Sequence, residues 1–107
     1  GELLKYARVS AAAGNWSKDL VLGVGGSATV YCADLAPFGR VAVKRFQQGA
    51  GAAGGRGFQR ELDALCQHRH PHVLEVIGSS ADGPENLIVM PLMEGGTLAQ
   101  AMPRMLW

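Results

Sequence analysis

Apolar residues recur in short runs that polar or glycine-rich turns separate, and this spacing predicts more strands than helices. The first three runs are rich in β-branched residues and follow one another closely, which predicts two successive antiparallel hairpins. Two later runs, joined by the polar turn 79–85, predict two further strands. The five predicted strands are 20–24, 29–35, 40–46, 73–77 and 87–90.

Two segments carry helix signals. Residues 1–16 contain an alanine run that ends at Gly14, which predicts a short helix with a stop. Residues 58–68 place apolar side chains at 58, 62 and 65, a helical stripe that Pro71 ends. Residues 47–57 are rich in glycine and alanine and predict a loop. The resulting order, β-β-β-α-β-β, predicts an α+β fold, a five-stranded antiparallel sheet that carries one helix.

Composition narrows the class of protein. The 107 residues carry a net charge of +1, so no strong field favours nucleic acid or an anionic membrane. The longest apolar stretch, Leu87–Met93, is too short to span a bilayer, and the amino terminus does not resemble a signal peptide. Cys32 and Cys66 lack the spacing of a small disulfide-bonded domain. We therefore expect a cytoplasmic protein with reduced thiols.

A glycine loop and a lysine are the strongest chemical signals. Gly23, Gly25 and Gly26 separate the first two predicted strands, and Lys44 lies on the third. Glycines let backbone N–H groups approach phosphates that a Cβ would hold away. A nearby lysine adds positive charge, so the pair of features indicates a nucleoside triphosphate site.

Glu61 is the expected partner of Lys44. Strand alternation places Lys44 on one face with Ala42 and Phe46, while Glu61 falls on the apolar side of the predicted helix. Each charge alone is also explained by a side chain that reaches solvent. Beside a glycine loop, the two together favour an ion pair. Ala42 and Val30 then leave room for a flat ring, although both also suit an ordinary core.

Other interpretations of the loop and of a histidine cluster fit less well. A dinucleotide fold needs the loop to open a helix, and a Walker loop needs Gly-Lys-Ser/Thr. A glycine loop between antiparallel strands is typical of protein kinases, and a glycine-rich hairpin turn is the simpler alternative. The alternating cysteine and histidines of residues 66–72 could in principle hold zinc, but Pro71 interrupts their alternation, and structural zinc usually takes four well-spaced ligands. We expect no metal site at the cluster Cys66, His68, His70 and His72.

Taken in order, these motifs resemble the amino-terminal lobe of a eukaryotic protein kinase, in particular the receptor-like, Pelle and interleukin-receptor-associated branch. The resemblance runs from Ser17 to the end of the chain and divides it into an extension, 1–16, and a partial kinase domain, 17–107. Five motifs carry it: the glycine loop 22–31, the lysine strand 41–44, the αC segment 58–62, the turn 70–74, and the strand, hinge and αD start 87–98.

The resemblance implies a role for each matching residue. Lys44 contacts the α- and β-phosphates of ATP and is held by Glu61. Met90 matches the gatekeeper, and Leu65 and Val76 match the spine that couples αC to the sheet. The nucleotide-binding residues implied are Leu22, Gly23, Val24, Gly25, Gly26, Ser27, Ala28, Val30, Ala42, Lys44, Met90, backbone groups of Pro91 and Met93, and Thr97 near the ribose.

Two departures from the family pattern lie in the loop. Ser27 replaces an aromatic residue, and Ala28 replaces the last glycine, which stiffens the loop if that position needs a positive φ. The catalytic loop and the Asp-Phe-Gly motif, which positions Mg²⁺, have no counterpart in the chain.

The resemblance therefore implies two possible functions, a main one and an alternative. The first is the ATP-binding lobe of a serine/threonine protein kinase, which phosphorylates a protein substrate with Mg²⁺ once a carboxyl-terminal lobe is present. The alternative is a pseudokinase or kinase-like fragment that binds nucleotide or a partner without catalysis. Either would be cytoplasmic or the intracellular part of a membrane-associated kinase.

Overall fold

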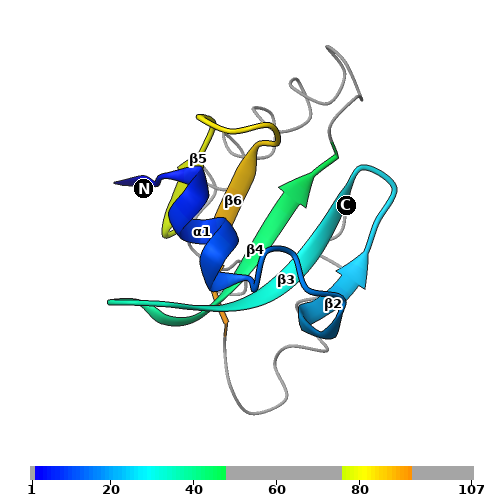
Figure 1. The fold of residues 1–107 in the computed structure, drawn as a ribbon, viewed down its shortest axis with the longest axis horizontal. Helices are drawn as coiled ribbons and strands as arrows, with labels where there is room; N and C mark the ends of the chain where they lie inside the picture. Colours follow the sequence, from blue (N-terminus) through cyan, green and yellow to red (C-terminus); the bar gives the residue numbers. More distant parts are fainter. Residues whose placement is uncertain (1, 48–75, 93–107) are drawn as a thin grey trace.

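The computed structural model describes residues 2–47 and 76–92, which form one six-stranded sheet with a helix against one face (Figure 1). The strands lie in the order β1-β5-β6-β4-β3-β2. The elements are β1 (Glu2–Leu3), α1 (Tyr6–Ala12), a 3₁₀ turn (Lys18–Leu20), β2 (Val21–Val24), β3 (Ala28–Leu35), β4 (Gly39–Phe46), β5 (Gly78–Ser80) and β6 (Leu87–Pro91).

The antiparallel sheet confirms the predicted fold class and adds one strand to it. Strands β2 to β6 pair antiparallel, whereas β1 pairs parallel with β5 at the edge. The short helix expected within 1–16 is α1, and the helix expected over 58–68 lies outside the described residues.

The fourth predicted strand was misplaced. Val76 and Ile77 precede the strand, and Ser79 and Ser80, expected in a turn, pair with β6. The strand begins at Gly78, where β1 approaches so closely that a Cβ would lie 2.6 Å from the carbonyl oxygen of Glu2. Glycine therefore fits this position although it is a poor strand former. Pairing with two neighbouring strands therefore selects this segment, despite its weak strand propensity.

The β3–β4 hairpin forms the centre of the sheet. Eight consecutive residue pairs match in register, from Ala28↔Phe46 to Leu35↔Gly39. Its turn is closed by the Phe38 N–H, which donates to the Leu35 carbonyl at 2.7 Å. Gly39 adopts φ +77°, a conformation that favours glycine.

Each face of the sheet carries its own buried cluster. Val9 and Ala13 of the helical segment pack with Val41, Val43 and other strand residues on one face. This is the face that α1 covers, and we call it the helix face (Figure 1). The opposite face, the lysine face, carries Ala28, Val30, Ala42, Phe46, Ile88 and Met90 around Lys44.

Candidate functional site

Lys44 is buried in the middle of the lysine face. It lies in β4, directly opposite Val30 of β3 and Ile88 of β6, and is only 1% exposed. Its Nζ lies 5.4 Å from the centre of the Phe46 ring. Because burying an ammonium group costs free energy, a lysine at the centre of a sheet face is unusual for an ordinary core position.

Small and apolar side chains form the floor beside Lys44. Ala42 lies opposite Met90 in register, and Val30 belongs to the same buried cluster. Leu22, from β2, is half-buried and packs on this cluster. The structure thus brings together the side chains that the sequence suggested for an adenine pocket.

The glycine loop is a tight hairpin between β2 and β3. The Gly25 N–H donates to the Ala28 carbonyl at 2.8 Å, and Gly26 and Ser27 are exposed. At Gly26 the backbone has no positive φ, and a Cβ would meet no atom within 4 Å. The fold itself does not require glycine at this position, which suits a loop whose backbone approaches a ligand.

Ala28 does not strain the loop. It is fully buried in β3 opposite Phe46, and its φ is not positive. We expected Ala28 to stiffen the glycine loop only if this position needed a positive φ, and it does not. Val24, at the end of β2, is 68% exposed, and Gly23 pairs with Val30.

Pro91 ends β6 at the expected hinge position. The Leu92 N–H donates to the Arg40 carbonyl at 3.3 Å, so the facing pair Val41–Pro91 is a non-hydrogen-bonded pair. The Pro91 carbonyl therefore points away from β4, and the missing N–H costs no bond to that strand. Glu61, Leu65, Met93 and Thr97 lie outside the described residues, as does the cluster from Cys66 to His72.

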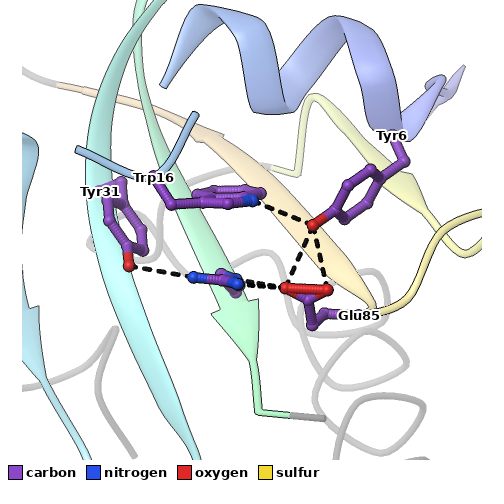
Figure 2. A network of polar contacts seen from close by, with 5 residues as sticks. Tyr6, Trp16, Tyr31 and Glu85 are labelled. Atoms are coloured by element: carbon purple, nitrogen blue, oxygen red, sulfur yellow. Dashed lines mark hydrogen bonds and ion pairs between the residues drawn. The ribbon is translucent and has the colours of Figure 1, made fainter. Parts of the chain in front are cut away.

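A polar network lies on the helix face, the side of the sheet opposite the lysine face. Figure 2 shows how Tyr6, Trp16, Tyr31 and Glu85 of this network lie relative to one another. Arg45 Nε donates to Glu85 Oε1 at 2.5 Å and a second guanidinium nitrogen contacts the same oxygen. The Tyr6 hydroxyl donates to the Glu85 carboxylate, with oxygens at 3.0 and 3.1 Å, and accepts from Trp16 Nε1 at 2.9 Å. Arg45 Nη1 donates to the Tyr31 hydroxyl at 3.3 Å.

Aromatic rings complete this network. The Trp16 ring centre lies 5.0 Å from that of Tyr31 and 5.9 Å from that of Tyr6, and the Arg45 guanidinium carbon lies 4.6 Å from the Trp16 ring centre. Burial raises the pKa of the Tyr6 phenol; the Trp16 hydrogen bond opposes this, and Glu85 reinforces it. Burial lowers the pKa of Arg45, but its hydrogen bonds to Glu85 and Tyr31 outweigh this, so the guanidinium stays charged.

Strand alternation puts Arg45 on the face opposite Lys44, but the sequence analysis did not identify its partners. Glu85 fell at the end of the predicted polar turn 79–85, yet only 6% of the residue is exposed. An arginine on an apolar strand face needs a buried acceptor. Glu85, a carboxylate just before the buried strand β6, was the signal in the sequence that could have identified this acceptor.

Comparison with known proteins decides the family. A profile described as protein tyrosine and serine/threonine kinase matches residues 17–105, most of the chain. The chain belongs to this protein kinase family. Its sheet is that of a kinase amino-terminal lobe, as expected from the motifs.

Plant receptor kinases are among the relatives of this kinase lobe. It is 36% identical over 84 residues to the leucine-rich repeat receptor protein kinase MSP1 of Oryza sativa subsp. japonica, covering 78% of the chain and 6% of the relative. The receptor protein kinase WSS1 of the same plant is 40% identical over 91 residues, covering 83% and 10%. An LRR receptor-like serine/threonine-protein kinase of Arabidopsis thaliana is 34% identical over 104 residues, covering 95% and 17%. The chain spans less than a fifth of the length of each of these relatives.

Two further observations concern membranes and metals. None of the helices that the structure describes is long and apolar enough to cross a bilayer. Within 2–47 and 76–92, no three His, Cys, Asp or Glu side chains are grouped in a way that could hold a metal ion.

Proposed function

We propose that the lysine face binds ATP as the amino-terminal lobe of a serine/threonine protein kinase. One observation carries the proposal: buried Lys44 shares a face with Val30, Ala42 and Met90, next to a hairpin whose exposed Gly26 has no structural need to be glycine. Kinase membership supports nucleotide binding, and the serine/threonine preference rests on the name of the Arabidopsis relative.

Each group on this face has a task in that function. The ammonium of Lys44 would hold the α- and β-phosphates, and the backbone of the exposed residues Gly26 and Ser27 would cover them, while the Gly25 N–H closes the hairpin. Leu22, with Val30 and Ala42, would pack against the adenine, whose edge would donate a hydrogen bond to the backbone carbonyl of Pro91. Glu61, Met93 and Thr97 keep their proposed roles in holding Lys44, the adenine edge and the ribose. The site is therefore proposed to combine an apolar floor with a charged end.

The remaining parts of the reaction are proposed from the family. Mg²⁺, when bound, neutralises charge on the phosphate oxygens, and the resemblance assigns its ligands to a carboxyl-terminal lobe. That lobe and a protein substrate are the proposed partners. The names of the relatives favour a cytoplasmic location, such as the intracellular part of a receptor. Residues 17–107 would form the partial kinase domain, with 1–16 as an extension packed on its helix face.

The Lys44→Met variant of the full-length protein tests this function. We expect phosphoryl transfer to a protein substrate to fall by about 10²–10³-fold, as when one preorganised charge donor is removed. Arg40→Met is the matched control, because it removes an exposed arginine from the same strand. Radiolabelled ATP gives the transfer rate, and titration calorimetry gives ATP affinity.

The outcomes separate the possible functions. A near wild-type transfer rate in Lys44→Met would reject the role of Lys44. Tight ATP binding by the wild type without any transfer would favour the pseudokinase alternative. No ATP binding by the wild type would reject the nucleotide site.

A further inference from the structure

Arg45 and Lys44 are adjacent residues whose side chains point to opposite faces of β4. Lys44 lies among the buried residues of the lysine face, whereas Arg45 reaches the network of the helix face. A rotation of β4 about its axis would move both side chains at once. Whatever fixes Arg45 on one face therefore restricts the position of the Lys44 ammonium on the other.

Arg45 is fixed by partners on three segments. Glu85 precedes β6, Tyr31 lies on β3, and Trp16 follows α1. The guanidinium is a planar fork, so its two contacts to Glu85 define a direction as well as a distance. The contacts to Glu85, Tyr31 and Trp16 thus restrain the direction in which the Arg45 side chain leaves β4.

The partners of Arg45 are themselves held. The Glu85 side chain is 5% exposed and also accepts from the Tyr6 hydroxyl. Trp16 adopts φ +66°, a conformation that is rare for a tryptophan and needs support from its surroundings. Gly83 packs so closely on Tyr6 that a Cβ would overlap its ring. The anchor of Arg45 is thus a packed unit rather than a single surface ion pair.

The same end of β4 is joined to the glycine loop. The Gln47 N–H, two residues after Arg45, donates to the Ser27 carbonyl at 3.0 Å. The Phe46 N–H donates to the Asn86 carbonyl at 3.0 Å, next to Glu85. Both the lysine and the loop proposed to contact phosphates therefore depend on the alignment of this short stretch.

We propose that Arg45 is a positioning residue for Lys44, and that the docked segment 2–16 acts on the nucleotide site through it. This inference rests on the proposed function, since it assumes that Lys44 contacts phosphate. Arg45 itself touches no nucleotide. Its anchoring to Glu85, Tyr31 and Trp16 sets the orientation of β4 from which the lysine reaches the phosphates.

The test compares ATP with adenosine, which has the same base and ribose but no phosphates. Affinities are measured by titration calorimetry on the full-length protein and its variant Arg45→Met, at a temperature where circular dichroism shows both folded. We expect the preference for ATP over adenosine to fall about fivefold, or about 1 kcal/mol, in Arg45→Met. Arg40→Met, from the same strand, should keep the preference.

A double-mutant cycle separates positioning from general damage. In a Lys44→Met background, Arg45→Met should change the preference little, because the group that it positions is gone. A loss of general structure would lower both affinities alike and leave the preference intact, which would overturn the proposal. An equal fall in preference with and without Lys44 would overturn it as well.

A second variant and the wild type itself provide further checks. If Arg45→Met does not fold, the pair Arg45→Met/Glu85→Met removes both charges and leaves no unpaired buried carboxylate. An unchanged preference in that double variant contradicts the proposal. If the wild type binds both ligands but shows no preference for ATP, the phosphate role of Lys44 fails first, and the positioning role falls with it. If it binds neither, the nucleotide site itself is rejected.

Discussion

Lys44 and Arg45 are neighbours of the same charge, yet they lie in very different surroundings. The Arg45 side chain keeps 31% exposure and bonds to a carboxylate and a phenol on the helix face. Lys44 is 1% exposed among small and apolar residues on the lysine face. One strand therefore presents a structural cation on one face and a candidate phosphate ligand on the other.

The difference shows how a small sheet can separate stability from binding. On the helix face, Val9 and the aromatic network consolidate β3, β4 and β6. This leaves the other face able to carry small residues such as Ala42, which contribute less to a core but leave space for a ligand.

Removing either member of the Arg45–Glu85 pair should destabilise the protein, but by different amounts. Arg45→Met leaves a 5% exposed carboxylate without its cation and, among residues 2–47 and 76–92, with the Tyr6 hydroxyl as its remaining donor, so we expect a loss of about 3 kcal/mol. Glu85→Met leaves a guanidinium that is 31% exposed and can be hydrated from the pocket of about 300 Å³ that Arg45 lines together with Thr29, Gln47 and Glu85. For that variant we expect a loss of about 1–2 kcal/mol.

Urea unfolding of the two variants checks this order. Equal losses, or a larger loss in Glu85→Met, would mean that burial of the carboxylate does not dominate. Arg40→Met is again the control, since Arg40 is exposed on the same strand, and it should change the free energy of unfolding by no more than about 0.5 kcal/mol.

Much of the fold could be predicted from local patterns. Turn residues and alternating apolar positions located β2, β3, β4 and β6 to within about a residue or two. β1 was not predicted, because a two-residue strand has no periodicity, and its pairing with β5 depends on a distant segment. β5 was shifted because its serines resemble a turn when their partners in β6 are ignored.

The two faces differ in how well sequence could reveal them. The residues of the lysine face occur in motifs, and the alternation of side chains along one strand was enough to predict that Lys44 and Ala42 share a face. The network of the helix face joins Tyr6, Arg45 and Glu85 across long stretches of sequence. No local rule links such residues, so the partners of Arg45 emerge only when the strands are placed in order.

A smaller effect should follow from the contact between Asp82 and the start of α1. The Asp82 carboxylate accepts from the Tyr6 backbone N–H at 2.8 Å and the Ser80 hydroxyl at 2.9 Å, which lowers its pKa below the usual range. Its stabilisation is therefore complete above the ordinary carboxyl pKa and is lost as the pH falls through the lowered pKa. Melting temperatures of the wild type and Asp82→Asn, measured from neutral to acidic pH, should converge at acidic pH. A gap that stays constant or widens in acid would show that the Asp82 charge does not stabilise the helix face.

Methyl NMR during an ATP titration tests the division between the two faces most directly. The methyl signals of Val30, Ala42 and Met90, on the lysine face, should shift, while those of Val9 and Val41, on the helix face, should stay close to their starting positions. Adding ATP to Lys44→Met should weaken the response without moving it elsewhere. Shifts concentrated on the helix face, or no shift on the lysine face at saturating ATP, would contradict the account.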